Sequence, residues 1–469
     1  MSCSTSRVRP IHQTATSVND GTERYNTMTI WTCNAGSFSG FEKDGCAHVT
    51  GIRYATSKRW EPPIPYVYDT GVHACTSPAP FAVQLPSKIE FALAGTAYET
   101  FPHEESCQYL SITMPAETTP ESNLPVMVWI HGGAYRNGGC DGPSYDRSPL
   151  ARENDVIVVG VNYRLGVLGF VRDQDGKPSN NGLLDILEAL LWINRNISAF
   201  GGDPGNVTLF GQSAGADAIM RIMAIDGAEL LYRHAIMQSA PLGTLEGRTA
   251  MEAKMLEELN AIPDDVPTHH LLDAQASIVA HVNEKGPAKR MVFAPHFGVF
   301  PLPSEEEAKA QMRRAAQGHE LLIGAMTREV AAYVGTNGKF AALDRFPITR
   351  PVVERVIERI GSEIFNVPVE EFARSYAEAG GTAFLYSFSW MQGQSVLGAS
   401  HCSDCLLLFG AGEAEGKPGC MGLSAREVLE AGAPFRKIWA DFAKTGKIKR
   451  VSLDGIIDIQ RLDNAPARR

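Results

Sequence analysis

The sequence of 469 residues lacks the features of several special classes of protein. None of its apolar runs approaches the roughly 18–20 residues that a membrane-spanning helix needs, and its polar first residues hold no apolar segment typical of a secretory signal. It has 43 Lys and Arg residues against 53 Asp and Glu, and the net charge of −10 argues against nucleic acid or an anionic membrane as a partner. We expect a cytoplasmic protein.

Cysteine is also scarce. Nine cysteines are too few for a disulfide scaffold, and their odd number leaves at least one thiol free. Cys402 and Cys405 form a C-x-x-C pair, but the second such pair that a zinc ribbon needs is absent. We interpret both as ordinary thiols and expect neither a metal nor an organic cofactor.

The chain has no internal repeat and no linker rich in Pro, Gly or Ser. Residues 1–27 are polar and are predicted to form a flexible tail. Residues 28–469 are predicted to form a single domain, for which the length is sufficient.

Short runs rich in Val, Ile, Leu and aromatic residues alternate with helical patterns. The predicted buried strands are PVMVWI (125–130), VIVVGVNY (156–163), VTLF (207–210), HAIMQS (234–239), LLIGAM (321–326) and AFLYSFSW (383–390). Helix-like stretches lie at 183–197, 304–317 and 424–446, the last as two pieces around Gly432 and Pro434. This alternation predicts an α/β fold with a mostly parallel sheet, helices on both faces and ligand-binding groups at the carboxyl ends of the strands.

One of the predicted strands runs directly into a G-x-S-x-G motif, Gly211 to Gly215, before a helical stretch. A serine on such a turn exposes its hydroxyl oxygen, and the N-terminus of the following helix favours negative charge beside it. Because a serine hydroxyl is a weak nucleophile until a base takes its proton, Ser213 is a nucleophile candidate that needs partners.

Two further places supply such partners. His131-Gly132-Gly133-Ala134 follows another strand, where glycines let backbone N–H groups face an oxyanion. An acid and a base must come later in the chain, and Glu329 and His401 each follow a predicted strand. The residues alone leave this choice open, since acidic residues are plentiful and the sequence has 12 histidines.

At this point the sequence resembles the type-B carboxylesterases, an α/β-hydrolase family that includes cholinesterases and bacterial para-nitrobenzyl esterases. The resemblance runs from about residue 35 to about residue 446 and is strongest in NISAFGGDPGNVTLFGQSAGA (196–216), which surrounds Ser213. GIRYA, VWIHGGAY, VNYRLGVLGF, NNGLLDILEALLWINRNI and WADFAKTG resemble further blocks in the same order. The resemblance implies the α/β-hydrolase fold, here with a reduced cap region because the interval between Glu329 and His401 is short.

The resemblance also implies roles for individual residues. Ser213 falls on the nucleophile, Glu329 on the acid and His401 on the base, and the oxyanion hole would be formed by the backbone N–H groups of Gly133, Ala134 and Ala214. It further implies a disulfide and two structural salt bridges, at Cys75 with Cys107, Arg59 with Glu105, and Arg164 with Asp185.

The sequence departs from the family at several positions. Gln212 stands where many members have glutamate, and Pro241 stands where many have a serine that supports the acid–base pair. Asp404 takes the place of a glutamate shortly after the histidine. These changes leave the candidate triad intact and alter its surroundings.

These observations predict a serine hydrolase that cleaves small carboxylic esters through an acyl-enzyme. One alternative keeps the triad and changes the bond to an amide, carbamate or lactone, because leaving-group and pocket contacts decide between them. The other is a catalytically inactive binding module of the same fold. The oligomeric state does not follow from the residues.

Overall fold

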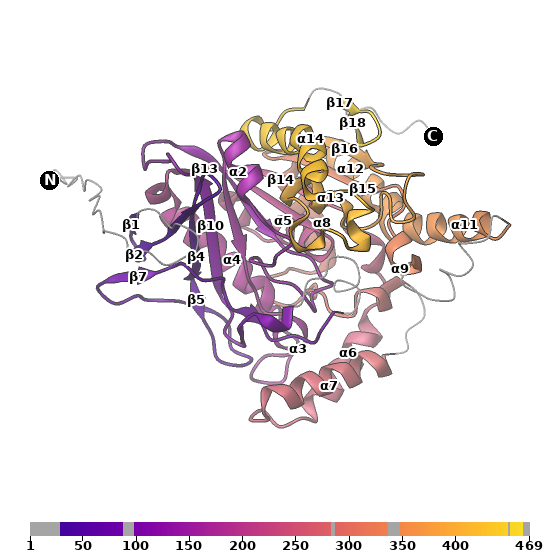
Figure 1. Cartoon of the computed structure of the whole chain (residues 1–469). Coiled ribbons are helices and arrows are strands. Elements are labelled where there is room, and N and C mark those ends of the chain that lie inside the picture. The colour runs from indigo at the N-terminus through magenta and orange to yellow at the C-terminus, as the bar shows by residue number, and fades with distance from the viewer. Residues whose placement is uncertain (1–28, 88–97, 283–286, 336–347, 449–450, 463–469) are drawn as a thin grey trace.

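The alternation of strands and helices produces one eleven-stranded sheet in the computed structural model, which describes residues 29–87, 98–282, 287–335, 348–448 and 451–462. Six central strands run parallel in the order β12-β11-β13-β14-β15-β16 (Figure 1). Their bounds are β11 Leu124–Ile130, β12 Ile157–Val161, β13 Gly202–Gln212, β14 His234–Gln238, β15 Glu320–Met326 and β16 Thr382–Phe388. All six predicted strands are therefore present and form the centre of the sheet.

Antiparallel strands extend the sheet on both sides. Beyond β12 lie β10 (Tyr109–Pro115), β4 (Cys46–Arg53) and β3 (Phe41–Lys43), and beyond β16 lie β18 (Ile457–Leu462) and β17 (Val451–Leu453). A small sheet has the order β1-β2-β7, with β1 Ile30–Cys33, β2 Gly36–Ser39 and β7 Val72–Ala74. Two further pairs are β5 (Ala55–Thr56) with β6 (Ile64–Pro65) and β8 (Phe81–Ala82) with β9 (His103–Glu104). The sheet is thus parallel in its middle and antiparallel at both flanks.

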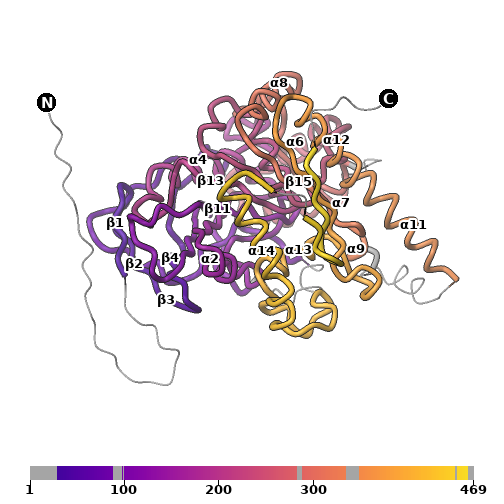
Figure 2. Tube along the Cα trace, turned by 90° about the horizontal axis from the view of Figure 1, so that it is seen from above, coloured from indigo at the N-terminus to yellow at the C-terminus, as the bar shows by residue number. Residues whose placement is uncertain are grey.

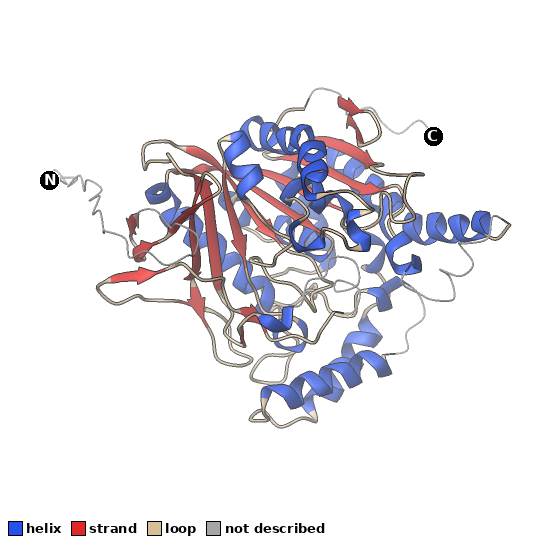
Figure 3. Ribbon diagram, viewed as in Figure 1, coloured by secondary structure: helices blue, strands red, loops and turns tan. Residues whose placement is uncertain are grey.

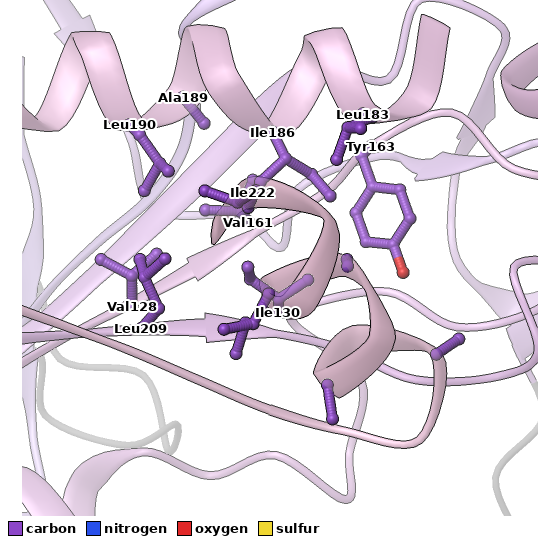
Figure 4. Packing of buried hydrophobic residues seen from close by; sticks show 14 of the residues in the cluster. Val128, Ile130, Val161, Tyr163, Leu183, Ile186, Ala189, Leu190, Leu209 and Ile222 are labelled. Carbon is purple, nitrogen blue, oxygen red and sulfur yellow. The ribbon is translucent and has the colours of Figure 1, made fainter. Parts of the chain in front are cut away.

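The central strands are apolar at nearly every position because both faces of the sheet are covered. In β11, Val126, Val128 and Ile130 belong to one buried cluster, whereas Met127 and Trp129 belong to another. Since successive side chains of a strand point to opposite faces, the two clusters are the two cores of a three-layer structure (Figure 3). Figure 4 shows the first core, where strand residues such as Val128 and Leu209 face helix residues such as Ile186.

Helices cover the two faces unequally. The face with the larger core carries α3 (Gly166–Phe170), α4 (Asn181–Asn196), α5 (Ala214–Met223), α6 (Thr249–Asn260), α7 (Thr268–His281), α8 (Glu305–Ala316) and α12 (Val367–Glu378). The other carries α2 (Ser148–Asn154), α13 (Ser403–Phe409) and α14 (Ala425–Thr445), and Figure 2 shows α13 and α14 across the strands from α8 and α12. Near the carboxyl end of β15 lie α9 (Ala331–Gly335) and α11 (Arg350–Gly361).

One helix differs from its prediction. The stretch 424–446 forms the single helix α14 with Pro434 inside it, not two pieces. An interior proline costs a helix about 3 kcal/mol, but α14 buries Phe435, Trp439 and Phe442 against the sheet, which outweighs that cost. Its end is as predicted, because Gly446 caps it in the left-handed conformation (φ 65°).

Three expectations are not decided by the fold. The predicted flexible tail (1–27) lies outside the described residues. The single domain from residue 28 and the reduced cap stay predictions.

Among the described residues, no helix combines the length and the apolar character that crossing a membrane requires.

Both predicted ion pairs are present, and the predicted disulfide is not. Arg59 pairs with Glu105, and the guanidinium of Arg164 binds both carboxylate oxygens of Asp185 at 2.8 Å. Cys75 and Cys107 are free, buried thiols, and burial raises the pKa of Cys75 to about 12. The Arg164–Asp185 pair connects the segment after β12 to α4.

Replacing Arg164 by methionine leaves the carboxylate of Asp185, which is fully buried, without its cationic partner. We expect the free energy of unfolding in urea to fall by about 3–5 kcal/mol, because an unpaired buried charge is costly. The matched control is Arg426→Met, whose exposed pair with Glu430 is worth at most about 0.5 kcal/mol. Equal losses in the two variants would contradict this expectation.

Candidate active site

Ser213 occupies the turn between β13 and α5, in a backbone conformation that L-residues rarely adopt (φ 57°, ψ −121°). Its N–H donates to the carbonyl oxygen of Gln238 at 2.8 Å, and its own carbonyl accepts from the N–H of Asp217 at 3.0 Å. Its side chain is half-buried, and within the described ranges its hydroxyl makes no hydrogen bond. The turn therefore presents an uncommitted oxygen at the carboxyl end of β13.

The glycines of the motif are required by a close backbone approach. A Cβ on Gly215 would lie 1.9 Å from the carbonyl oxygen of Ile130, and one on Gly211 would lie 2.7 Å from the same atom. A Cβ on Gly132 would lie 2.6 Å from the carbonyl oxygen of Gln212 and 3.2 Å from the Ser213 Cβ. The end of β11 thus packs directly on the serine turn, where no side chain fits between them.

The loop after β11 holds backbone N–H groups beside this serine. Gly133, Ala134 and Tyr135 have φ values of 108°, 54° and 55°, and the Gly133 carbonyl accepts from the N–H groups of Arg136 and Asn137. In the described part of the chain, no protein acceptor takes the N–H of Gly133, Ala134 or Ala214. The last of these begins α5, where N–H groups lack helical partners, so all three remain free to donate to a substrate.

Glu329 and His401 come together from loops that follow neighbouring parallel strands. Glu329 Oε2 lies 2.6 Å from His401 Nδ1, and Glu329 Oε1 accepts from the Met326 N–H at 2.8 Å. The N–H of His401 also donates to the carbonyl oxygen of Glu329 at 3.0 Å. Since the carboxylate accepts from Nδ1–H, the other ring nitrogen, Nε2, is left with the lone pair that a base needs.

Gln212 is the partner of that second nitrogen. Its side-chain Nε2 lies 3.1 Å from His401 Nε2, so the amide donates to the lone pair of the imidazole. No hydrogen bond between this nitrogen and Ser213 is present among the described residues. The sequence predicted no contact for Gln212. The only indication was that glutamine stands where many family members have glutamate.

A buried polar network lies under the base. Gln238 Nε2 donates to Asp404 Oδ2 at 2.5 Å, and Trp439 Nε1 donates to Gln238 Oε1 at 3.2 Å. Burial raises the pKa of Asp404 to about 6. The hydroxyl of Ser239 is buried and has no hydrogen-bond partner among the described residues. It lies in the segment that contains Pro241.

A second contact that the sequence did not reveal connects the glycine loop, the segment after β11 that contains Gly132 and Gly133, to α5. The hydroxyl of Tyr135 donates to Asp217 Oδ2 at 2.7 Å, and both side chains are fully buried. Tyr135 and Asp217 follow the two motifs by only a few residues, but no pattern in one sequence links them. This bond adds a side-chain contact between the loop and the helix that follows Ser213.

These groups open into one pocket of about 250 Å³. Ser213, His401, Gly133 and Ala134 all line it, as do the aromatic and apolar side chains of Tyr98, Tyr145, Tyr333, Leu397 and Leu406. Cys402 and Cys405 lie at its wall, and within the described residues neither is part of a disulfide. Within the described residues, no group of three or more His, Cys, Asp or Glu side chains forms a metal site.

His296 is another buried histidine downstream of Ser213, and it does not line this pocket. Its Nε2 donates to the carbonyl oxygen of Phe170 at 2.6 Å, and its Nδ1 lies 3.1 Å from Glu252 Oε2. His296 together with Arg248 lowers the pKa of Glu252 to about 2 despite its burial. Its place is therefore structural.

Comparisons with known proteins agree with this geometry. The model of the carboxylesterase family matches residues 28–345. The chain is 36% identical to a probable N-octanoylanthranilate hydrolase of Rhodococcus erythropolis, over 86% of this chain and 89% of that one. It is 31% identical to the para-nitrobenzyl esterase of Bacillus subtilis over 90% of each chain. The structure of a thermophilic PNB esterase superposes with a TM-score of 0.76 at 28% identity, covering 93% of this chain and 98% of that chain.

Replacing Gln212 by glutamate tests its contact with the imidazole. A carboxylate beside His401 Nε2 would stabilise the protonated ring, which cannot act as a base. We expect the acid limb of the pH profile of kcat/KM to move to higher pH by about one unit, whereas Gln212→Met, which has no charge, should leave the limb within about 0.3 units. The same displacement in both variants would contradict a charge effect.

Asp404→Asn tests the buried carboxylate. Because burial raises the folded-state pKa from 3.8 to about 6, the charged side chain destabilises the folded state above pH 6, and the penalty disappears as pH falls towards 3.8. We expect the variant to gain roughly 1–3 kcal/mol in the free energy of unfolding at pH 8 and to lose this gain by about pH 4. Urea unfolding across pH measures it, and a gain that grows as pH falls would contradict the assignment.

Proposed function

The chain belongs to the carboxylesterase family and is a carboxylic-ester hydrolase, and we propose that Ser213, His401 and Glu329 are its nucleophile, base and acid. The observation that carries this proposal is the 2.6 Å contact between Glu329 and His401, whose imidazole lines the same pocket as Ser213. The alternative of an inactive binding module of the same fold is not favoured by this arrangement.

In the first half of the reaction, His401 Nε2 takes the proton of the Ser213 hydroxyl as its oxygen attacks the ester carbonyl. This requires the imidazole to turn from Gln212 towards the serine, which is consistent with the looser geometry of free active sites. Glu329 keeps the ring oriented and stabilises its cation. His401 then gives the proton to the departing alcohol, and the acyl group stays on Ser213.

In the second half, the same histidine takes a proton from water, which attacks the acyl-enzyme and releases the acid. In both halves negative charge develops on the former carbonyl oxygen. The N–H groups of Gly133, Ala134 and Ala214 are proposed to stabilise it, because no acceptor in the described part of the chain takes them and two of these residues line the pocket. Loss of one such donor typically costs about 3–4 kcal/mol of barrier.

Amide hydrolysis with the same residues is the second candidate. It is favoured by the 36% identity to a probable N-octanoylanthranilate hydrolase, since an N-acyl group is joined through an amide. The same triad serves both bonds, and the difference lies in protonation of the leaving nitrogen.

A series of para-nitrophenyl esters and matched anilides, from acetyl to decanoyl, tests these assignments. We expect ester hydrolysis with a Ser213→Ala rate lower by at least about 10³-fold, because the covalent step is lost. Glu329→Gln should lose about 10²–10⁴-fold, as loss of the orienting carboxylate does in such triads.

The Cys402→Ser variant, altered beside His401 without removing a triad group, serves as the control for local disturbance. Wild-type ester hydrolysis by the Ser213→Ala enzyme would contradict the proposed mechanism. Anilide turnover as fast as ester turnover at equal acyl length would favour amide hydrolysis as the function.

A further inference from the structure

The charge of the catalytic pocket is opposite to that of the whole protein. The chain carries a net charge of −10, whereas the described residues that line the pocket include Arg136 and Arg290 and no aspartate or glutamate. The two arginines come from different parts of the chain. Arg136 follows the glycine loop, and Arg290 is the last residue of a 3₁₀ turn. Their convergence therefore depends on the tertiary structure.

Neither guanidinium has a carboxylate partner within the described part of the chain. Among the described residues, the side chain of Arg136 hydrogen-bonds only to the amide oxygen of Asn137, at 3.4 Å, and that of Arg290 makes no hydrogen bond. Both pocket arginines are exposed to solvent, unlike the buried Arg147 and Arg436, which pair with Asp141 and Glu153. The planar donor sets of the two pocket arginines are thus available to a ligand.

From these observations we infer that Arg136 and Arg290 select substrates that carry an ionised carboxylate besides the bond to be cleaved. This inference rests on the proposed function, because the pocket is the one that holds Ser213 and His401. A guanidinium matches a carboxylate through two parallel N–H···O bonds, which neutral esters cannot offer. The two guanidinium groups also attract anions from solution, although the net charge of the protein is negative.

The remaining walls define the rest of such a substrate. Tyr98, Tyr145 and Tyr333 offer aromatic faces, and Leu397 and Leu406 offer apolar surface, in a pocket of about 250 Å³. This lining suits an aromatic or medium-length aliphatic body between the cleaved bond and the carboxylate. The substrate class is therefore an ester or amide of this kind with one free carboxylate.

The test compares matched substrates that differ only in charge. On the acyl side these are para-nitrophenyl hexanoate and the mono-para-nitrophenyl ester of adipic acid, and on the leaving-group side phenyl octanoate and ortho-carboxyphenyl octanoate. For each pair the readout is kcat/KM for the anionic substrate divided by that for the neutral one. We expect Arg290→Gln and Arg136→Gln to lower this ratio relative to wild type, and the double variant to lower it by at least about tenfold in one series.

Three comparisons make the result specific. Arg313→Gln, which removes an exposed arginine that does not line this pocket, should leave the ratio at the wild-type value. Arg290→Lys keeps the charge and loses the bidentate geometry, so its ratio should fall between the wild-type ratio and that of Arg290→Gln. Raising salt from about 50 to about 500 mM should lower the wild-type ratio, because exposed charges are screened.

The outcomes separate this inference from the proposed function. If Ser213-dependent hydrolysis is present and the double variant keeps the wild-type ratio in both series, the inference is wrong and the proposed function stands. If neither neutral nor anionic substrates are hydrolysed by a folded wild-type enzyme, the proposed function fails first. Arg290 lies outside the glycine loop, so a lowered ratio in Arg290→Gln supports the inference without a disturbed oxyanion loop.

Discussion

The backbone contact between the end of β11 and the turn at Ser213 is the constraint on which the whole site depends. The carbonyl oxygen of Ile130 occupies the space that a Cβ of Gly215 would need, and a Cβ on Gly132 would likewise lie too close to the carbonyl oxygen of Gln212. This contact fixes where α5 begins and how far the glycine loop lies from the serine. Because it excludes side chains, the loop's free N–H groups and the Ser213 hydroxyl can face one pocket.

The acid and the base depend on the order of the strands. Glu329 and His401 are 72 residues apart, but β15 and β16 are parallel neighbours whose loops leave the same edge of the sheet. Arg328 binds the carbonyl oxygens of Val396 and Gly398 and so connects these loops next to the pair. The geometry of the pair is thus supported by backbone contacts on both sides.

Charge is placed differently in the core and in the pocket. Arg164, Arg147 and Arg436 are buried with carboxylate partners, as burial of a charge requires. Asp404 is an exception, since its partners are the amide of Gln238 and not a cation, and burial raises its pKa. In the pocket, where a substrate would supply the counter-charge, the arginines have no acidic partner among the described residues.

The sequence by itself determined the strands, the turn and the identity of the candidate triad, because apolar runs, paired glycines and family motifs are local patterns. It predicted one long helix as two pieces, since the cost of Pro434 is local and the packing of Trp439 that outweighs it is not. It implied a disulfide at Cys75 and Cys107 that the structure does not contain. Only the tertiary structure decided that Gln212 contacts His401, that Tyr135 binds Asp217 and that Arg136 and Arg290 share a pocket. Each of these contacts joins residues from separate elements, and their distance depends on how the sheet is ordered and covered.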